Sequence, residues 1–518
     1  MSNKIFMRRF WLLAIVALVV FGCKDASETN TNTDTTISDD VNNNVEQYRS
    51  RFHFTPEANW MNDPNGLVYF DDTYHLFYQY YPHGTVWGPM HWGHAVSKDL
   101  LNWEHKPIAL YPDKHGYIFS GSAVIDKQNT AGFGENAMVA VYTYHNANLE
   151  KENSILYQTQ GIAYSTDKGE TWTKYKNNPV LDNPGIKDFR DPKVFWNVDK
   201  LKWQMLLAAK DHIQIYESNN LKNWAKISEF RLNDNPPLGV WECPDLFKLT
   251  VEGSTEEKWV LIISHGGESS PNGGSGTRYF VGDYDGITFT TNQKVNKWID
   301  YGTDNYAGVT YNNTPNNKRI FIGWMSNWNY ATVTPTETWR SAMTLPRELK
   351  LIKNDNGYLV KSKLIDGFDN LTSKVPEAQI TGTYPTKFSY SNLQHSVVAF
   401  NATINTELSL ELSNKDGDTY TVGYNKNTGE FFVNRGKSGH VDFNENYKKS
   451  AYQTMQIGTK EQLSITMVLD ASSVEIFINN GEYVMTTQVF PNSDFTNFEI
   501  KNPKGITINN FEFKEVKK

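Results

Sequence analysis

Hairpins of β-rich residues recur five times along the first two thirds of this 518-residue chain, at intervals of roughly 50–70 residues. Each hairpin joins two runs of β-branched and aromatic residues through a polar connection, which is the signature of paired strands. The paired runs are residues 67–70 with 74–80, 122–125 with 138–144, 194–196 with 203–208, 245–249 with 259–264, and 307–311 with 320–324. This period predicts similar small sheets arranged around a common axis.

A polar turn that ends in Trp accompanies the hairpins. It ends at Trp103, Trp172 and Trp224, and a degenerate fourth copy ends at Trp298. No amphipathic helix pattern interrupts the repeats. We therefore predict an all-β fold whose first domain is a five-bladed β-propeller. A β-sandwich of similar strands is the alternative, but it gives no reason for the period.

The chain is too long for one ordinary core, and its pattern changes after the fifth hairpin. Alternating strands separated by turns fill the C-terminal part, as at residues 396–400, 408–412, 463–469 and 474–478. This alternation predicts a second all-β domain, most simply a two-sheet β-sandwich. The expected boundaries are a propeller at residues 49–351, a connector at 352–378 and a C-terminal β-sandwich at 379–518.

The N-terminus is expected to direct export rather than to join the fold. Basic residues precede an apolar run at residues 10–21, which is too short to cross a bilayer comfortably. Gly22 and Cys23 follow, and a small residue before Cys at this place resembles the bacterial lipobox. Residues 1–23 therefore predict a lipoprotein-type signal peptide with a lipidated Cys23, and an ordinary cleaved signal peptide is the alternative.

Residues 24–48 are mostly Asn, Thr, Ser and Asp, a composition that buries little apolar surface and predicts a disordered tether. Together with the leader, the tether predicts an exported protein that is lipid-anchored to a bacterial membrane. The protein would then act in the periplasm or at the cell surface, and would contact the membrane only through its anchor.

Charge and cysteine content exclude several classes of function. The net charge of −8 gives no reason to expect a nucleic-acid partner. The two cysteines, Cys23 and Cys243, are too few for a disulfide framework or a Cys-rich metal site. His91 and His94 lie in a strand-like segment that places them on opposite faces, so we expect neither a metal nor a cofactor.

Three carboxylates are expected just before the first strands of hairpins one, three and four, at equivalent positions of the repeat, and Pro follows each acid within two residues. They are Asp63, Asp191 and Glu242. The first strand of each blade lies nearest the propeller axis, so we expect these side chains to converge at one end of the channel. Two carboxylates flanking a scissile bond are the usual machinery of glycoside hydrolysis, and a third can bind substrate hydroxyls.

Four motifs carry a resemblance to a known family. They are WMNDPNG at residues 60–66, FSGS at 119–122, FRDP at 189–192 and WECP at 241–244. In this order they resemble glycoside hydrolase family 32, which includes levanases, inulinases, fructan β-fructosidases and invertases. The resemblance spans residues 49–518 and implies a five-bladed propeller followed by a β-sandwich.

The resemblance implies a role for each acid. Asp63 looks like the nucleophile, Glu242 like the general acid and base, and Asp191 like the transition-state stabiliser. A retaining mechanism is implied, for which the carboxyls of Asp63 and Glu242 should lie about 5–5.5 Å apart. The matching substrate-binding positions are Asn62, Gln79, Trp87, Phe119, Ser120, Arg190 and Trp324.

The leading hypothesis is an exo-acting hydrolase that releases fructose from levan or inulin. A sucrose-directed invertase, an endo-acting levanase and a fructosyl transferase are alternatives that share the mechanism. An inverting arabinose- or xylose-releasing propeller enzyme would hold its acids about 6.5–9.5 Å apart. A surface glycan-binding protein is the alternative without catalysis.

Overall fold

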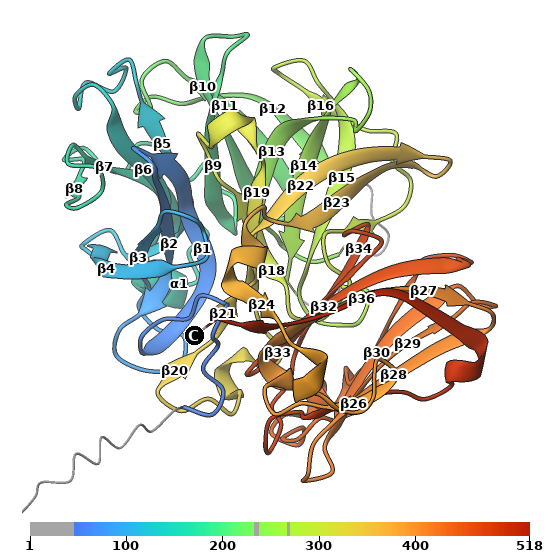
Figure 1. Ribbon diagram of the computed structural model, residues 1–518. Helices are drawn as coiled ribbons and strands as arrows, with labels where there is room; N and C mark the ends of the chain where they lie inside the picture. Colours follow the sequence, from blue (N-terminus) through green and yellow to red (C-terminus); the bar gives the residue numbers. More distant parts are fainter. Residues whose placement is uncertain (1–45, 233–237, 267–269, 518) are drawn as a thin grey trace, which may run out of the picture. The chain divides into compact units, whose positions relative to one another are not determined.

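The computed structural model describes residues 46–232, 238–266 and 270–517, which belong to one compact unit spanning Glu46–Lys518 (Figure 1). The predicted signal peptide, Cys23 and most of the predicted tether lie outside the described residues. The last tether positions, however, are part of the fold. Tyr48 is buried at 7% exposure, and its hydroxyl donates to the carbonyl of Pro491 at 3.2 Å. The tether prediction was therefore too long at its C-terminal end.

Five small antiparallel sheets form the N-terminal domain. Blade 1 contains β1 (Asn59–Phe70), β2 (Thr73–Tyr81), β3 (His91–Ser97) and β4 (Trp103–Leu110). Blade 2 contains β5 (Tyr117–Asp126), β6 (Ala137–His145), β7 (Gln158–Ser165) and β8 (Thr173–Lys174). Blade 3 contains β9 (Phe189–Asn197), β10 (Lys202–Ala209), β11 (His212–Ser218) and β12 (Ala225–Arg231). Blade 4 contains β13 (Trp241–Thr250), β14 (Glu257–His265), β15 (Gly276–Tyr284), β16 (Phe289–Thr290) and β17 (Lys297–Trp298). Blade 5 contains β18 (Tyr306–Thr310), β19 (Ile320–Met325), β22 (Arg347–Asn354) and β23 (Gly357–Leu364).

The first strands of the blades contact one another in a closed ring, in the order β1, β5, β9, β13 and β18. Asn312 closes the ring between the fifth blade and the first. Its backbone N–H donates to Leu67, and its carbonyl accepts from the N–H of Tyr69. Two short strands, β20 (Trp339–Arg340) and β21 (Ala342–Met343), extend blades 1 and 5. The predicted five-bladed propeller is confirmed.

Burial patterns explain why these residues form strands of two kinds. All residues of β6 are buried, because the middle strand of a blade packs against neighbouring blades on both faces. The sandwich strand β28 (Glu407–Ser413) instead alternates, with Leu408, Leu410 and Leu412 inside. A period of two is expected where only one face of a sheet meets a core.

The Trp-ended phrase is the turn between the third and fourth strands of a blade. Asp99 and Asp167 accept hydrogen bonds from backbone N–H groups that follow them, as Asx turns do. The fourth copy does not end at Trp298, as the sequence pattern suggested. In blade 4 this turn has Asp285, which accepts from the N–H groups of Ile287 and Thr288.

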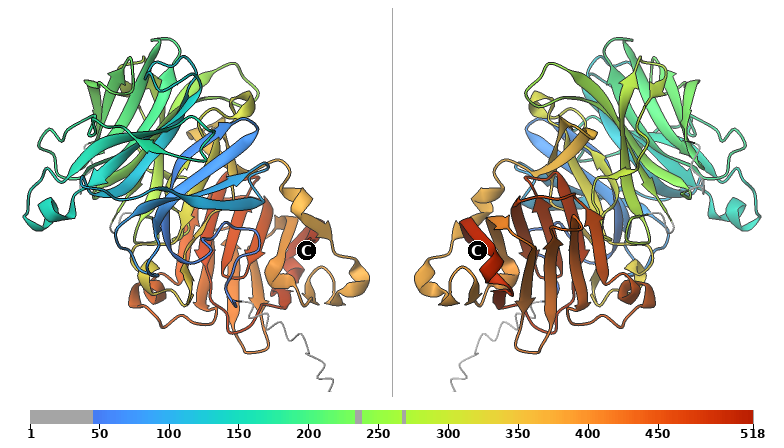
Figure 2. Two further views of the ribbon diagram at one scale, coloured as in Figure 1. Left: turned by 90° about the vertical axis from the view of Figure 1, so that its left-hand side faces the viewer. Right: turned by 90° about the vertical axis from the view of Figure 1, so that its right-hand side faces the viewer.

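The C-terminal domain is the predicted two-sheet sandwich, whose orange to red strands fill the lower part of both views in Figure 2. One sheet runs β24 (Thr372–Lys374), β36 (Ile506–Val516), β27 (Ser396–Ile404), β32 (Gln462–Asp470), β33 (Ser473–Ile478) and β34 (Tyr483–Gln488). The other runs β25 (Thr381–Thr383), β26 (Lys387–Ser389), β35 (Asn497–Ile500), β28, β29 (Thr419–Asn425), β30 (Glu430–Lys437) and β31 (Tyr452–Gln456).

The described helices are short. They are α1 (Ala147–Lys151), α2 (Glu445–Lys449), η1 (Pro315–Asn317), η2 (Ala331–Val333), η3 (Phe368–Leu371), η4 (Glu377–Gln379), η5 (Leu393–His395) and η6 (Pro503–Gly505). Of the residues described, no helix has the length and apolar character needed to cross a membrane.

The domain boundary differs from the one expected. Residues 352–364 complete the fifth blade, because β23 pairs with β22 along its whole length. Thr372–Lys374 already pairs with the last sandwich strand. The connector is thus confined to residues 365–371. The sequence signal was weak here because β23 carries alternating Lys residues on its outer edge and lacks the aromatic pattern of the earlier strands.

Buried ion pairs join the two domains. Arg347 of blade 5 bonds Asp300 and Glu475, each at 2.8 Å, and all three side chains are almost fully buried. Arg435 of the sandwich bonds Asp304 at 2.8 Å. Breaking such a pair by removing one partner is costly because it leaves an uncompensated buried charge.

His53 extends this network and predicts a pH-dependent stability. Its Nδ1 lies 2.8 Å from Asp470 Oδ2, and its Nε2 lies 2.9 Å from Glu475 Oε1. Burial alone would lower the pKa of His53, but hydrogen bonds to the two carboxylates raise it to about 9. The stabilisation is therefore complete below pH ~6.5, the unfolded pKa, and is lost as pH rises through about 9.

We expect His53→Gln to lower the melting temperature, with a stability cost of about 3–5 kcal/mol near pH 6. The difference from the unaltered protein should shrink between pH 6.5 and 9.5, as measured by calorimetry across that range. His83→Gln, at an exposed position, is the matched control. An equal pH slope in His53→Gln and the unaltered protein would contradict the assignment.

Candidate active site

Every first strand of the propeller carries a β-bulge at the same level. Two residues of the first strand face one residue of the second, which bends the strand and re-aims its side chains. The five bulges are Asn62-Asp63 facing Gln79, Phe119-Ser120 facing Thr143, Asp191-Pro192 facing Leu207, Cys243-Pro244 facing Ile263, and Ala307-Gly308 facing Gly323.

The three acids occupy successive positions around these bulges. Glu242 stands just before its bulge, Asp191 is the first bulge residue and Asp63 the second. The expectation that they precede their strands at equivalent positions was therefore wrong, since all three lie within the strands. Asp191 has φ 65°, a left-handed conformation rarely held by a non-glycine residue, which shows how strongly its direction is fixed.

Asp63 is held from both sides. Its Oδ1 accepts from Asn62 Nδ2 at 2.9 Å, and its Oδ2 accepts from Ser120 Oγ at 2.7 Å. Asn62 is itself positioned by Trp60, whose indole N–H donates to the Asn62 amide oxygen at 2.7 Å. Two donors fix the orientation of this carboxylate, as an attacking group requires.

The residues just before the bulges of blades 3, 4 and 5 form one hydrogen-bonded row. Arg190 donates to Glu242 Oε1 from Nε at 3.1 Å and from Nη2 at 2.7 Å. Tyr306 donates to the other oxygen of Glu242. Arg190 is braced in turn by Asp188 at 2.8 Å. Burial raises the pKa of Glu242, as does the charge of Asp63, while Arg190 opposes the rise.

Asp191 lies beside both other acids. Its Oδ2 accepts from the backbone N–H of Cys243 at 3.0 Å and lies 4.0 Å from Arg190 Nε. Burial raises the pKa of Asp191 to about 7, with the charges of Glu242 and Asp63 adding to the rise and Arg190 opposing it. Interacting carboxyls titrate as a group, so this cluster retains a proton near neutral pH.

Cys243 is the centre of the cluster. Its buried free thiol lies 3.6 Å from Asp63 Oδ2 and 3.7 Å from Asp191 Oδ2, so both carboxylates touch one sulfur atom. Burial raises the pKa of this thiol well above its usual value, and the surrounding carboxylates raise it further. A thiol held neutral is no nucleophile. The neutral Cys243 thiol therefore separates the carboxylates of Asp63 and Asp191 without adding a third negative charge.

The remaining predicted binding residues, Gln79, Trp87, Phe119 and Trp324, differ in their burial and contacts. Gln79 donates to the carbonyl of Ile118 at 3.0 Å and so fixes the second blade against the first. Trp87, 39% exposed, packs edge-on against Phe119 with ring centroids 6.0 Å apart, which places both rings beside Ser120. Trp324, by contrast, is fully buried.

Trp324 packs among other aromatic rings rather than facing open space. Its centroid lies 6.1 Å from Trp60 and 4.9 Å from Trp328, and its indole nitrogen has no partner among the described residues. Trp328 is only partly buried and stacks on Trp60 at 5.9 Å. The sequence motif indicated the buried member of this aromatic group and missed the more accessible one.

Tyr306 was also missed by sequence reasoning, although a signal for it existed. It occupies in blade 5 the position that Glu242 occupies in blade 4 and Arg190 in blade 3. Aligning the repeats residue by residue would have singled it out. A search for carboxylates alone passed over it.

We expect Tyr306 to position Glu242 through its hydrogen bond, and Tyr306→Phe tests this role. A hydrogen bond to a charged group contributes about 1.5–3 kcal/mol, so we expect kcat to fall roughly 10- to 100-fold. Because the lost donor favoured the charged carboxylate, the pKa of Glu242 should rise further, and the alkaline limb of the rate profile should move to higher pH. Tyr74→Phe, in the first hairpin, is the control. A lower kcat with an unmoved limb would contradict the role.

Comparisons with known proteins agree with this geometry. The model of the N-terminal domain of glycosyl hydrolases family 32 matches residues 53–362, and the model of that family's C-terminal domain matches residues 366–516. A levanase of Bacillus subtilis is 45% identical over 477 residues, which cover 88% of this chain and 68% of the levanase. An extracellular exo-inulinase of Aspergillus niger is 38% identical over 504 residues, covering 89% and 93% of the two chains. The crystal structure of an exo-inulinase from Aspergillus awamori superposes with a TM-score of 0.81 at 33% identity, covering 91% of this chain and 98% of that one.

Proposed function

Because the chain belongs to glycosyl hydrolase family 32, we propose that it is a retaining fructan hydrolase that releases fructose through a covalent fructosyl-enzyme. The observation that carries the proposal is the meeting of Asp63 and Asp191 at one buried thiol, with Glu242 held beside them by Arg190. No metal or cofactor takes part in the proposed reaction.

Asp63 is the proposed nucleophile. One of its oxygens attacks the anomeric carbon of the terminal fructose while the bond to the leaving oxygen breaks, which leaves the fructosyl group as an ester on Asp63. The hydrogen bonds from Asn62 and Ser120 orient the carboxylate for this attack. Holding the attacking atom in place lowers the entropic part of the barrier.

Glu242 is the proposed acid and base. In the first step it gives its proton to the leaving oxygen, and in the second it takes a proton from the water that hydrolyses the ester. Its raised pKa favours the protonated form that a general acid needs. Arg190 and Tyr306 hold the carboxyl in place through both steps.

Asp191 is the proposed transition-state stabiliser. Its backbone is fixed by the bulge, and its carboxylate is aimed beside Asp63 by the N–H of Cys243. Hydrogen bonds from fructose hydroxyls to this carboxylate would strengthen as positive charge develops on the sugar ring. Trp87, Phe119 and Trp328 offer apolar rings at the edge of the same site.

The proposed substrate is levan or inulin, attacked from the chain end. Relatives named levanase and exo-inulinase support this choice over sucrose. Product analysis on levan, inulin and sucrose tests it. Free fructose as the first product of a polymer indicates exo action, whereas oligosaccharides indicate the endo-levanase alternative, and turnover of sucrose alone indicates an invertase. No product from any of the three would overturn the enzymatic proposal and favour a glycan-binding protein.

Retention is tested separately by NMR of the first-formed anomer. Retention yields the β-anomer of fructose from a β-fructan, and the α-anomer as first product would overturn the covalent mechanism.

We also propose that the enzyme is exported and held at a bacterial membrane by a lipid on Cys23. The extracellular location named for the exo-inulinase relatives supports export. In a bacterial host, Cys23→Ala should abolish incorporation of labelled palmitate and move fructan-degrading activity from the membrane fraction to the soluble fraction. Cys243 is the matched cysteine, and Cys243→Ser should keep the label. Palmitate incorporation that persists in Cys23→Ala would contradict the anchor.

A further inference from the structure

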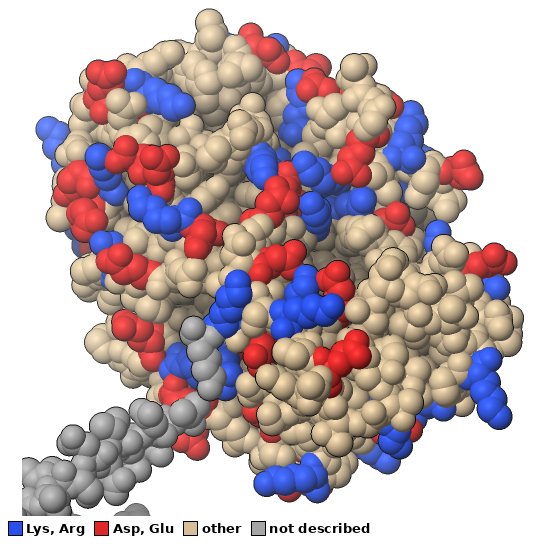
Figure 3. Space-filling view, viewed as in Figure 1, with Lys and Arg blue, Asp and Glu red and all other residues tan. Residues whose placement is uncertain are grey.

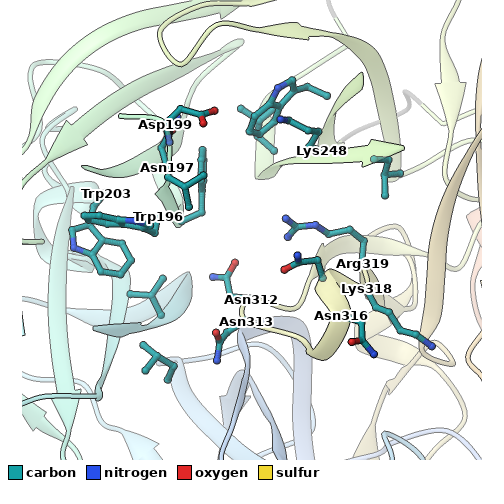
Figure 4. A pocket seen from close by; sticks show the side chains of 18 of the residues that line it. Trp196, Asn197, Asp199, Trp203, Lys248, Asn312, Asn313, Asn316, Lys318 and Arg319 are labelled. Atoms are coloured by element: carbon teal, nitrogen blue, oxygen red, sulfur yellow. Dashed lines mark hydrogen bonds between the residues drawn. The ribbon is translucent and has the colours of Figure 1, made fainter. Parts of the chain in front are cut away.

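A cavity of about 840 Å³ opens at the end of the propeller channel opposite the three acids. The acids lie in the N-terminal halves of β1, β9 and β13, whereas the cavity is lined by the C-terminal ends of β5, β9 and β13 and by the loop after β18 (Figure 4). Cavities of this size commonly bind small molecules. The proposed hydrolysis makes no use of this one.

A layer of polar contacts separates the cavity from the acids. Lys193 bonds Asp245 at 3.1 Å, and Thr310 donates to the same carboxylate oxygen from its N–H and its hydroxyl, each at 2.7 Å. The Asn312 side chain donates to the carbonyls of Ala123 and Val194 from the opposite side of the ring. The channel is filled at this level, so the cavity is a separate site.

The Arg319 guanidinium projects toward the middle of the cavity without a partner (Figure 4). Among the described residues it has no hydrogen bond and no ion pair, and its Nε is buried. Its nearest contact of note is the ring of Phe247, 5.5 Å from Cζ. Burial lowers the pKa of Arg319, and the charge of Asp245 opposes this shift. A half-buried guanidinium that makes no hydrogen bond leaves its donors open to an anionic group of a ligand.

Most carboxylates around the cavity are already engaged, but Asp199, which also lines it, makes no ion pair or side-chain hydrogen bond among the described residues (Figure 4). Asp245 is occupied by Lys193, Glu348 by Lys350 at 2.5 Å, and Glu257 by Lys248 at 3.3 Å. Asp126 accepts from its own loop at Thr130 and Ala131. Figure 3 shows basic and acidic side chains interspersed over the face of the molecule that it draws, with no large patch of one sign. Among the lining residues, the charged groups with neither an ion pair nor a side-chain hydrogen bond are therefore Arg319 and, at the exposed rim, Lys127 and Asp199.

The walls of the cavity suit a sugar. The half-buried indoles of Trp196 and Trp259 present flat apolar faces. The side-chain amides of Asn313 and Asn316, both at exposed positions, lie around the cavity with Arg319 (Figure 4). Flat rings combined with amide donors and acceptors recognise a polyol, and a guanidinium fork recognises a carboxylate or phosphate.

We propose that this cavity is a second ligand site, which takes a small sugar bearing one carboxylate or phosphate group and pairs that group with Arg319. The indoles and amides then contact the sugar body. The site is independent of the acids, so its failure leaves the proposed hydrolysis untouched, and loss of hydrolysis leaves this site untouched.

Isothermal titration of the full chain with glucose 6-phosphate, glucuronate, inorganic phosphate and glucose tests the proposal. We expect saturable binding of at least one acidic sugar, with glucose and inorganic phosphate each at least tenfold weaker. Arg319→Gln should weaken binding of the acidic sugar at least tenfold. Asn316→Asp adds a negative charge beside Arg319 and should weaken binding of the acidic sugar about threefold. Residue 316 is exposed and has φ 55°, which Asp tolerates, so this variant should keep the fold.

Lys415→Gln, which removes one positive charge from an exposed sandwich turn, should leave the affinity unchanged. Fructose release should be the same in all three variants. The proposal is overturned if no acidic sugar binds, if glucose or inorganic phosphate binds as tightly as the acidic sugar, or if Arg319→Gln retains the affinity. Should Arg319→Gln fail to fold, an unchanged affinity in Asn316→Asp overturns it.

Discussion

Replacing Asp63 by Asn is expected to lower kcat on levan or inulin by at least about 10⁴-fold, equivalent to about 5.5 kcal/mol of barrier. The amide keeps the size of the side chain, and Asn62 and Ser120 remain in place, but it cannot form the fructosyl ester. Reducing-sugar release, followed over days at high enzyme concentration, measures the residual rate. Binding of fructan oligosaccharides, measured by titration, should persist because the rest of the site is intact.

Asp71→Asn is the matched control for this substitution. Asp71 is exposed at the turn of the first hairpin, where it pairs with Lys168 at 2.6 Å. Asp71→Asn makes the same Asp-to-Asn change a few residues along the chain, and its kcat should stay within twofold of that of the unaltered enzyme. A residual rate in Asp63→Asn within tenfold of the unaltered enzyme would show that another group carries the nucleophilic step.

Much of the fold could be predicted from the sequence because each blade is a local unit. A hairpin such as residues 67–80 pairs with itself, so its pattern of β-branched residues and its polar turn contain nearly all the information needed. The period then predicts closure into a ring. The predicted propeller ended at residue 351, before β23. This outer strand faces solvent and is under little constraint to be apolar, so its sequence pattern is weak.

The arrangement of the acids was harder to predict, because it depends on pairing rather than on spacing. A bulge adds one residue to the first strand, and only the partner strand shows where. Reading Asp63, Asp191 and Glu242 as equivalent therefore placed them near one another but not in order. Because the acids occupy different positions relative to their bulges, Glu242 hydrogen-bonds with Arg190 and Tyr306, whereas Asp63 hydrogen-bonds with Ser120.

The burial of individual side chains also could not be predicted from the motifs. Trp324 and Trp328 are four residues apart, and both suit a sugar face by composition. Packing against Trp60 and Tyr306 buries the first completely, whereas the second remains partly exposed. Tertiary packing of this kind is decided by residues that are distant in the sequence.

Glu242→Gln is expected to separate the two chemical steps. Loss of general acid and base catalysis should lower kcat on fructans roughly 10²- to 10⁴-fold. An aryl fructoside, whose leaving group needs no proton, should still form the fructosyl-enzyme quickly, giving a burst of phenol followed by a slow steady state. Added azide should restore turnover by attacking the ester without needing a base, and the product should be the β-fructosyl azide.

The pH dependence of the rate should also distinguish Glu242→Gln from the unaltered enzyme. The proposed mechanism needs Glu242 protonated, so the rate of the unaltered enzyme should fall as pH rises through the raised pKa of that carboxyl. Gln cannot lose a proton, so the alkaline limb should disappear from the variant's profile. Glu229→Gln, on an outer strand of blade 3, is the matched control and should keep both rate and limb. An alkaline limb that survives in Glu242→Gln would assign the proton donor to another member of the cluster, and Asp191, whose pKa is raised to about 7 by burial, is the group that would then have to supply it.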